Sequence, residues 1–304
     1  TRFKNCPVFA ILSRHWPSRP SEAAVAETVS PLPDRRRNLY RSDLAEAGLE
    51  GVVPADRYVT GAPARICQPI VPGRLTPNHA KPRDTEFLMG EPVLVFDRAD
   101  NLAWVKSQRD GYVGYIDQGA LIFGAPAPTH RVNTIRSHLY PAPELKRFAL
   151  AALPYGALVT VIDRTEKWAK LADGQWVALA HLVPVSQTAK DPVAEAMRFL
   201  GVPYLWGGRS SDGMDCSALV QFALEACGIP CPRDSDMQEA ELDRADLQAT
   251  DLIFWPGHVG MMMDRDRMIH ANATDMAVRV WTLSDFEAHI IRIEGHEIRT
   301  IKRL

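Results

Sequence analysis

One cysteine has the setting of a thiol nucleophile. Cys216 follows a glycine-rich approach, Gly-Val-Pro-Tyr-Leu-Trp-Gly-Gly at 201–208, and stands where an apolar helical pattern begins. At the start of a helix, backbone N–H groups and the positive end of the dipole favour a thiolate. The same N–H groups can stabilise an oxyanion. We therefore expect Cys216 to attack a carbonyl carbon.

Two downstream histidines could supply the base that such a nucleophile needs. His258 lies in Gly-His-Val-Gly and His270 in Ile-His-Ala, with the turn-like string Asp-Arg-Asp-Arg at 264–267 between them. Antiparallel strands joined by this turn would bring the two imidazoles together if both face one side of a sheet. His258 would then be general base and acid, and His270 would orient its ring.

The same three side chains allow a second interpretation. One thiolate and two imidazoles form a known catalytic zinc set, so Cys216, His258 and His270 could hold a metal ion instead. Loss of activity with chelators would favour the metal site, and loss with thiol alkylation alone would favour the peptidase.

The elements that must position these residues are helices followed by strands. Asp191 is a natural N-cap with Pro192 at the first helical position, and Gly201 is expected to end this helix. A second helix is predicted over 219–227, with Gly228 after its end. Strand-like runs follow at 251–255, 258–263 and 268–271. This order is typical of an α+β domain.

The region before residue 187 contains an internal repeat. The segment 90–98 matches 156–164 at an offset of 66 residues, and each copy is followed by a tryptophan, Trp104 or Trp168. Each copy is about 60 residues of short strands, a size that closes as a small barrel. The predicted organisation is an N-terminal extension (1–60), two SH3-like β-barrels (61–125 and 126–187) and a peptidase domain (188–304). Within the extension, 43–51 could form a short helix.

Composition excludes several functional classes. The chain has 304 residues, 46% of them apolar and 24% charged, with a net charge of -2. This balance predicts no nucleic-acid partner, and the one basic run, Arg35 to Arg37, is expected to be a solvated segment. No stretch approaches the ~20 apolar residues of a membrane span, so no membrane contact is expected. Nothing implies a cofactor, and we expect a monomer.

The cysteines and the N-terminal region bear on the compartment. The five cysteines are odd in number and dispersed, which is typical of a reducing compartment. No apolar run is long enough for a signal peptide. We expect a cytoplasmic bacterial protein, or a secreted one if an export signal has been removed.

Six strings between residues 190 and 290 resemble the NlpC family of cell-wall peptidases. In order they are GVPYLWGG, DCSALVQ, GIPCPRDSDMQ, TDLIFW, GHVGMM and MIHANA. The resemblance implies a papain-like fold and a Cys-His-His triad, onto which Cys216, His258 and His270 fall by position. It covers nearly the whole C-terminal domain, and the strings together are far more specific than any one alone.

The two SH3-like units narrow the resemblance to γ-D-glutamyl-L-diamino-acid endopeptidases of murein peptide recycling. In that subclass the first SH3 domain closes the end of the cleft that holds the free amine of an N-terminal L-Ala. The expected partner is therefore a murein tri- or tetrapeptide. The resemblance suggests substrate-binding residues on both sides of the cleft: Asp215, Ser217, Tyr204 and Trp206 from the peptidase, and Glu86 with Tyr112 or Tyr115 from the first SH3-like unit.

A physical argument supports such a pocket. A buried ammonium without a paired carboxylate is costly, so Asp215 would select for a free N-terminus. A wall formed by another domain would exclude intact peptidoglycan strands, whose L-Ala amine is bound to muramic acid. Three alternatives stay open: a secreted endopeptidase on intact cell wall, a binding module with an inert thiol, and a related thiol acyltransferase or amidase. The choice between lysine and diaminopimelate as diamino acid also stays open.

Overall fold

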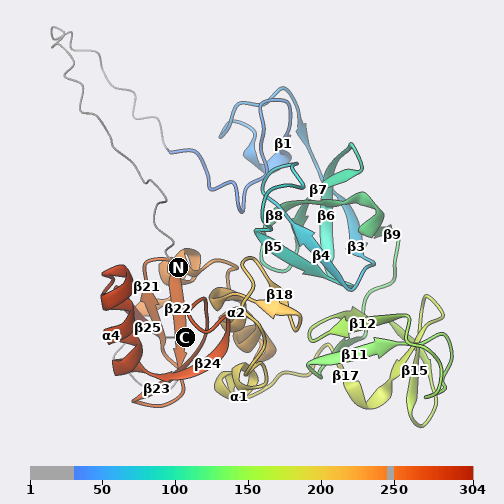
Figure 1. Ribbon diagram of the computed structural model, residues 1–304. Helices are drawn as coiled ribbons and strands as arrows, with labels where there is room; N and C mark the ends of the chain where they lie inside the picture. Colours follow the sequence, from blue (N-terminus) through green and yellow to red (C-terminus); the bar gives the residue numbers. More distant parts are fainter. Residues whose placement is uncertain (1–30, 245–249, 304) are drawn as a thin grey trace, which may run out of the picture. The chain divides into compact units, whose positions relative to one another are not determined.

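The computed structural model describes residues 31–244 and 250–303 (Figure 1). In chain order these are a short N-terminal segment, two strand-rich units and a C-terminal unit of helices and strands. Among the described residues, no helix is long and apolar enough to cross a membrane.

The C-terminal unit is built on a six-stranded sheet in the order β20-β25-β21-β22-β23-β24, and every neighbouring pair is antiparallel. Its strands are β20 (Asp243–Arg244), β25 (Thr300–Arg303), β21 (Leu252–Trp255), β22 (His258–Met262), β23 (Arg267–Asn272) and β24 (Ala277–Thr282). The three strands predicted from apolar runs are confirmed as β21, β22 and β23. The other three were not predicted.

In the part of the C-terminal unit that the structure describes, four helices accompany this sheet: α1 (Pro192–Met197), α2 (Cys216–Ala226), α3 (Ser235–Glu241) and α4 (Leu283–Glu294). The predicted cap of α1 is confirmed, because the Asp191 carboxylate accepts hydrogen bonds from the N–H groups of Val193 and Ala194. The helix ends at Met197, and turns continue to Gly201, whose φ is +85°. The predicted second helix is confirmed as α2, followed by Gly228 at φ +80°.

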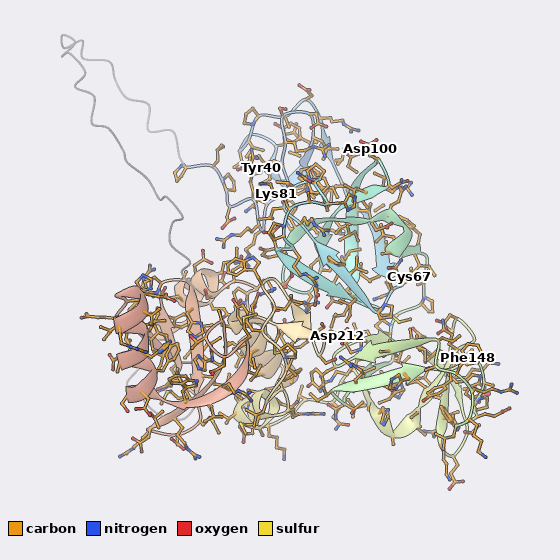
Figure 2. All side chains as sticks on the ribbon, in the orientation of Figure 1. Tyr40, Cys67, Lys81, Asp100, Phe148 and Asp212 are labelled. Atoms are coloured by element: carbon orange, nitrogen blue, oxygen red, sulfur yellow. The ribbon has the colours of Figure 1, made fainter. Side chains whose placement is uncertain are left out.

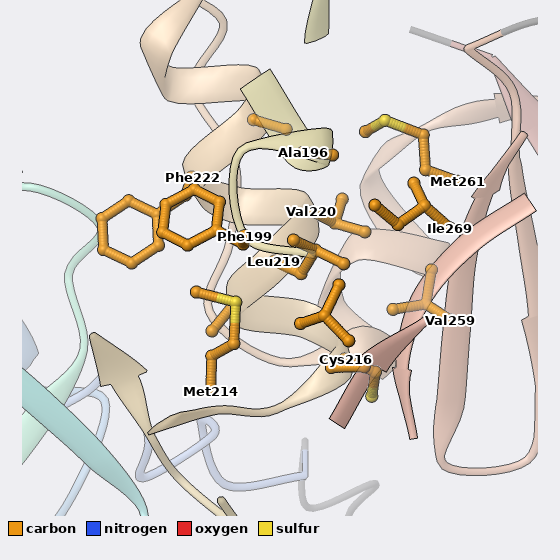
Figure 3. Packing of buried hydrophobic residues seen from close by; sticks show 14 of the residues in the cluster. Ala196, Phe199, Met214, Cys216, Leu219, Val220, Phe222, Val259, Met261 and Ile269 are labelled. Carbon is orange, nitrogen blue, oxygen red and sulfur yellow. The ribbon is translucent and has the colours of Figure 1, made fainter. Parts of the chain in front are cut away.

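Helices α2 and α4 pack on opposite faces of the sheet. Leu219 of α2 belongs to one buried cluster with Val259 and Ile269 (Figure 3). Met262, on the alternate face of β22, packs with Phe286 of α4. Each such buried side chain contributes about 1.5–3 kcal/mol. This packing fixes the first residue of α2, Cys216, against the strands that carry both histidines.

The first strand-rich unit contains a five-stranded sheet, β8-β7-β6-β3-β9, and a β4–β5 hairpin. The strands are β3 (Ala62–Ile66), β4 (Ile70–Gly73), β5 (Thr85–Leu88), β6 (Pro92–Ala99), β7 (Leu102–Ser107), β8 (Val113–Asp117) and β9 (Leu121–Phe123). The core includes the fully buried Val93, Ala103 and Val105.

The second strand-rich unit repeats the first. Its strands are β10 (His130–Val132), β11 (Arg136–Leu139), β12 (Ala151–Pro154), β13 (Leu158–Val159), β14 (Val161–Arg164), β15 (Trp168–Leu171), β16 (Trp176–Ala178) and β17 (Leu182–Pro184). The bulge between Val95 and Asp97 recurs between Val161 and Asp163, 66 residues later. The sequence repeat is thus confirmed at the level of strands, whereas the domain boundaries stay predictions.

The second unit is also tied to the C-terminal unit. Arg136 of β11 forms an ion pair with Asp212, which is labelled in Figure 2. Asp212 lies in the turn between β18 (Arg209–Ser210) and β19 (Gly213–Met214), directly before α2. The approach to Cys216 is therefore held by residues outside the peptidase unit.

The N-terminal segment, residues 33–59, is not helical over 43–51 as proposed. It forms β1 (Ala45–Glu46), a single 3-10 turn (Ala47–Leu49) and β2 (Tyr58–Val59), which pairs with β1 in parallel. The reason is tertiary packing: Leu39 and Leu44 are fully buried against Trp104 and Tyr115 of the first strand-rich unit. Local helix propensity is also weak in a stretch that contains Gly48.

Candidate active site

Cys216 is the first residue of α2 and is almost completely buried. The Asp215 carboxylate caps the helix by accepting a hydrogen bond from the Ala218 N–H at 2.9 Å. Burial, followed by the charge of Asp215, raises the pKa of the Cys216 thiol to about 12, although the backbone N–H groups of Val259 and Ser217 oppose this rise. Figure 3 shows Cys216 and Val259 facing each other. The resting side chain is a thiol that needs a base.

His258 and His270 provide a directly bonded pair of rings. Nε2 of His258 lies 2.9 Å from Nδ1 of His270, with ring centroids 5.1 Å apart. Both histidines therefore face one side of the sheet, which is the condition under which the paired strands bring the two rings together. Among the described residues, none forms a hydrogen bond with Nδ1 of His258. The next residue, Val259, turns its N–H toward the Cys216 sulfur, so strand β22 begins beside the thiol, while the His258 ring packs against Trp255 and Phe286.

Both imidazoles are held in the neutral form. Burial lowers the pKa of His258 to about 4. Burial, followed by repulsion from His258, holds the pKa of His270 well below its usual range. Phe286 of α4 contributes to this apolar setting, with its ring edge-on to His270 at a centroid distance of 4.4 Å. A neutral imidazole next to a thiol can accept the thiol proton.

A further polar contact holds His270 at the ring nitrogen that does not face His258. The Asn272 side-chain nitrogen lies 3.2 Å from Nε2 of His270, and Asp275 bonds both ends of that amide. The row His258–His270–Asn272 therefore leaves little freedom in either ring. The sequence analysis did not identify Asn272, although its i+2 position on the same strand puts it on the same face as His270.

The zinc interpretation finds no further ligand group here. Within residues 31–244 and 250–303, no cluster of three or more His, Cys, Asp or Glu side chains is placed to hold a metal ion. The two rings bond to each other through one nitrogen each. Whether these residues hold a metal ion is therefore to be tested by measuring activity in the presence of a chelator.

A cavity of about 330 Å³ opens beside Cys216. Three parts of the chain line it: Arg36 from the N-terminal segment; Leu75, Asp84 and Tyr112 from the first strand-rich unit; and Trp206, Gly207, Asp215, Cys216, Ser217, Asp234, Ser235, Asp236 and Gly257 from the C-terminal unit. The structure thus brings four predicted substrate-binding residues, Asp215, Ser217, Tyr112 and Trp206, to one cavity with the nucleophile.

Two residues proposed from the first SH3-like unit lie elsewhere, and the structure corrects them. The Glu86 carboxylate is buried and accepts a hydrogen bond from the Arg209 N–H at 2.8 Å, because strand β5 turns it toward β18 rather than the cavity. Tyr115 stacks on Trp104 and bonds Arg41 under the N-terminal segment. The acid that this unit supplies to the cavity is Asp84.

Tyr204 has an intermediate position. It does not line the cavity, yet it lies close enough to Cys216 and Asp215 for their charges to add to the effect of burial in raising the pKa of its hydroxyl. Tyr204 therefore lies near the nucleophile without lining the cavity.

Asp215 already has a cationic partner inside the protein. Arg233, which is 1% exposed, donates to the two carboxylate oxygens at 2.9 and 2.7 Å and to Ser217 Oγ at 3.0 Å. Asp215 thus caps a helix, pairs with a buried guanidinium and lines the cavity. Its role as counter-ion for a substrate ammonium stays a prediction.

Asp234 is a further acid that lines the cavity. Its Oδ2 accepts hydrogen bonds from the Tyr112 hydroxyl at 3.0 Å and from Arg36 at 2.9 Å. Its Oδ1 accepts none from the described residues. Burial raises the pKa of Asp234, and Arg233 and Arg36 counteract the rise. Asp234 was not predicted as a site residue, because its contacts with Tyr112 and Arg36 come from distant parts of the chain.

Comparison with known proteins agrees with this architecture. Residues 201–293 match the NlpC/P60 family, and residues 74–121 match the bacterial dipeptidyl-peptidase Sh3 domain. The γ-D-glutamyl-L-lysine dipeptidyl-peptidase of Bacillus subtilis is 30% identical over 229 residues, covering 66% of this chain and 76% of that protein. Its namesake from Bacillus cereus is 27% identical over 68% of this chain and 72% of its own length.

A solved structure of an NlpC/P60 family protein from Bacillus cereus has a TM-score of 0.67. The match covers 80% of this chain and 99% of that one at 21% identity, which supports the fold. Together with the first SH3-like unit and the α+β C-terminal unit, these matches show that the chain belongs to the NlpC/P60 family of cysteine peptidases.

Proposed function

We propose that this peptidase hydrolyses the bond between γ-D-glutamate and an L-diamino acid in murein peptides that carry a free N-terminal L-Ala. The observation that carries the proposal is the cavity beside Cys216, to which the first strand-rich unit contributes Asp84 and Tyr112. The two relatives named γ-D-glutamyl-L-lysine dipeptidyl-peptidase support it.

The cavity suits a short peptide with a positive end. At about 330 Å³ it lies at the small end of ligand sites, which span about 300–1,000 Å³. Asp84 and Asp234 offer carboxylates, and an ammonium group needs such a partner when it leaves water. An L-Ala-D-Glu unit has its ammonium at one end and the scissile carbonyl at the other. In this arrangement the acids hold the amine while Cys216 meets the carbonyl.

In the first step the Cys216 sulfur attacks the γ-carbonyl carbon of D-Glu, and Nδ1 of His258 takes the thiol proton. Backbone N–H groups at the start of α2 stabilise the oxyanion. His258 then gives the proton to the departing amine of the diamino acid, and a thioester remains. His270, bonded to Nε2 of His258, keeps the ring in position throughout.

In the second step a water molecule attacks the thioester. His258 accepts a proton from the water and returns it to the sulfur as the tetrahedral intermediate collapses. L-Ala-D-Glu leaves with a new carboxyl group, which loses the second proton of the water to solvent, and the thiol is restored. No other co-reactant is needed.

The test is mass spectrometry of L-Ala-γ-D-Glu-L-Lys and L-Ala-γ-D-Glu-meso-diaminopimelate incubated with the protein. We expect release of L-Ala-D-Glu by wild type and by Cys227→Ala, a control at the other end of α2, and none by Cys216→Ala. Absence of release from both peptides by wild type would overturn the proposal. The ratio of the two rates gives the preferred diamino acid.

Two further arms separate the alternatives. Cleavage of the muramyl-capped peptide at the same rate as the free-amine peptide would contradict the requirement for a free amine. Release of peptide from whole sacculi would contradict it as well. Inactivation by a chelator would favour the metal site, whereas we expect inactivation by thiol alkylation alone.

A further inference from the structure

Arg36 lies in a short, hydrogen-bonded turn that precedes the first strand-rich unit and places its side chain at the cavity. The Asn38 N–H bonds the Asp34 carbonyl at 2.9 Å, and the Arg36 N–H bonds the Asp34 side chain at 2.8 Å. The Arg36 carbonyl accepts a hydrogen bond from the Val113 N–H at 2.8 Å. The backbone of Arg36 is therefore fixed to β8 independently of its side chain.

Its guanidinium is bonded by three carboxylates. It donates to Asp34 from Nε and Nη2, to Asp234 from Nη1 at 2.9 Å, and to Asp236 from Nη1 and Nη2 at 2.9 and 2.7 Å. Arginine suits this role because its planar fork presents five N–H donors. The expectation that the basic run is a free solvated segment is thus wrong for Arg36.

The position of this side chain is at the border between the cavity and solvent. Arg36 lines the cavity, and its side chain is 26% exposed. It shares Asp234 Oδ2 with Tyr112, so it lies on the acidic side, where the substrate amine is expected. Asp34, Asp234 and Asp236 surround Arg36, and Arg233 also acts on Asp234. Carboxylates still outnumber guanidinium groups on this side, which leaves it attractive to an ammonium.

We propose that Arg36 is a specificity-determining residue that closes the cavity behind the substrate amine. The inference rests on the proposed function and extends it: the end wall comes from the N-terminal segment, in addition to the SH3-like unit. A peptide that begins with L-Ala ends at this wall. One more residue adds about 3.3–3.6 Å of chain and would meet the guanidinium, which its three carboxylates hold in place.

The experiment compares two substrates with three proteins. The substrates are L-Ala-γ-D-Glu-L-Lys and the same peptide extended by an N-terminal glycine, which keeps a free amine. The proteins are wild type, Arg36→Ala and Arg35→Ala. Arg35 is a matched control because it is exposed, lies over the Tyr40 ring at 4.7 Å and does not line the cavity. Thermal melts confirm that each variant is folded.

We expect the ratio of kcat/KM for the extended peptide to kcat/KM for the tripeptide to rise at least tenfold in Arg36→Ala. The ratio in Arg35→Ala should equal that of wild type. An unchanged ratio in a folded Arg36→Ala, or a wild type that cleaves both peptides equally well, would overturn the proposed role of Arg36. Either result would leave the proposed function standing. A wild type that cleaves neither peptide would overturn the proposed function and this inference with it.

Discussion

The 2.9 Å contact between Nε2 of His258 and Nδ1 of His270 joins two strands of one sheet at the point where the thiol needs a base. His258 belongs to β22 and His270 to β23, and these strands are paired through Met261 and Ile269. The orientation of the base is thus a property of the sheet itself. A residue that only orients the base affects the rate less than the base does.

The first prediction separates these two roles. His258→Ala should lower kcat by about 10²–10⁴, the usual contribution of a general base. His270→Ala should lower kcat by a smaller factor. The kcat of His270→Asn should lie between those of wild type and His270→Ala, because an amide can still bond Nε2 of His258. His181→Ala, in the second strand-rich unit, serves as control and should leave kcat unchanged. Equal losses for His258→Ala and His270→Ala would contradict the division of roles.

The second prediction concerns pH. Burial raises the pKa of Cys216 to about 12 and lowers that of His258 to about 4, so both groups are neutral between these values. As pH falls through about 4, His258 becomes protonated and can no longer accept the thiol proton. We therefore expect kcat/KM to be flat from about pH 5 to 8 and to fall below that range.

The ultraviolet absorbance of a thiolate provides the check on that prediction. Wild type at pH 7 should show no more thiolate than Cys216→Ser. A thiolate signal at pH 7 with an acid limb near pH 6 would indicate a preformed thiolate–imidazolium pair instead.

The third prediction uses two tyrosines of the same strand-rich unit. Tyr112→Phe removes the hydroxyl that bonds Asp234 and should raise KM for the free-amine tripeptide several-fold with a small change in kcat. Tyr115→Phe removes a hydroxyl that bonds Arg41, outside the cavity, and should leave KM unchanged. Steady-state kinetics of both variants test the assignment. A larger rise in KM for Tyr115→Phe than for Tyr112→Phe would show that Tyr115 is the tyrosine that contributes to substrate binding.

These tyrosines also show what the sequence could predict. Features that depend on residues close together in the sequence were predicted. These are the cap at Asp191, helix α2 and the strands that carry the two histidines. The motif around Tyr112 indicated that one tyrosine contributes to the pocket but not which. That choice depends on the packing of Leu39 and Leu44 over Tyr115, which buries it under another segment.

The acidic side of the cavity could not be predicted for a related reason. Arg36 and Asp234 are 198 residues apart, and neither lies in a pattern that requires the other. Their contact exists only once separate units are packed together. The same holds for Asp84, which the sequence does not distinguish from Glu86 two residues later.

The last prediction concerns the ion pair under the nucleophile. Arg233 is 1% exposed and bonds both oxygens of Asp215, so its removal leaves a buried carboxylate without its cation. Breaking one side of a buried pair costs about 3–5 kcal/mol. Arg233→Met should therefore lower the free energy of unfolding by that amount, measured in urea at pH 7. It should also reduce kcat, because Asp215 caps the helix that begins at Cys216.

Arg147→Met is the matched control, since the pair of Arg147 with Glu144 is more than half exposed on both sides. Exposed pairs of this kind contribute about 0–1 kcal/mol. A loss below 1 kcal/mol in Arg233→Met would mean that Asp215 does not depend on Arg233. The Asp215 carboxylate would then be available to a substrate ammonium, as the sequence predicts. A loss of several kcal/mol leaves Asp84 and Asp234 as the acids that meet the substrate.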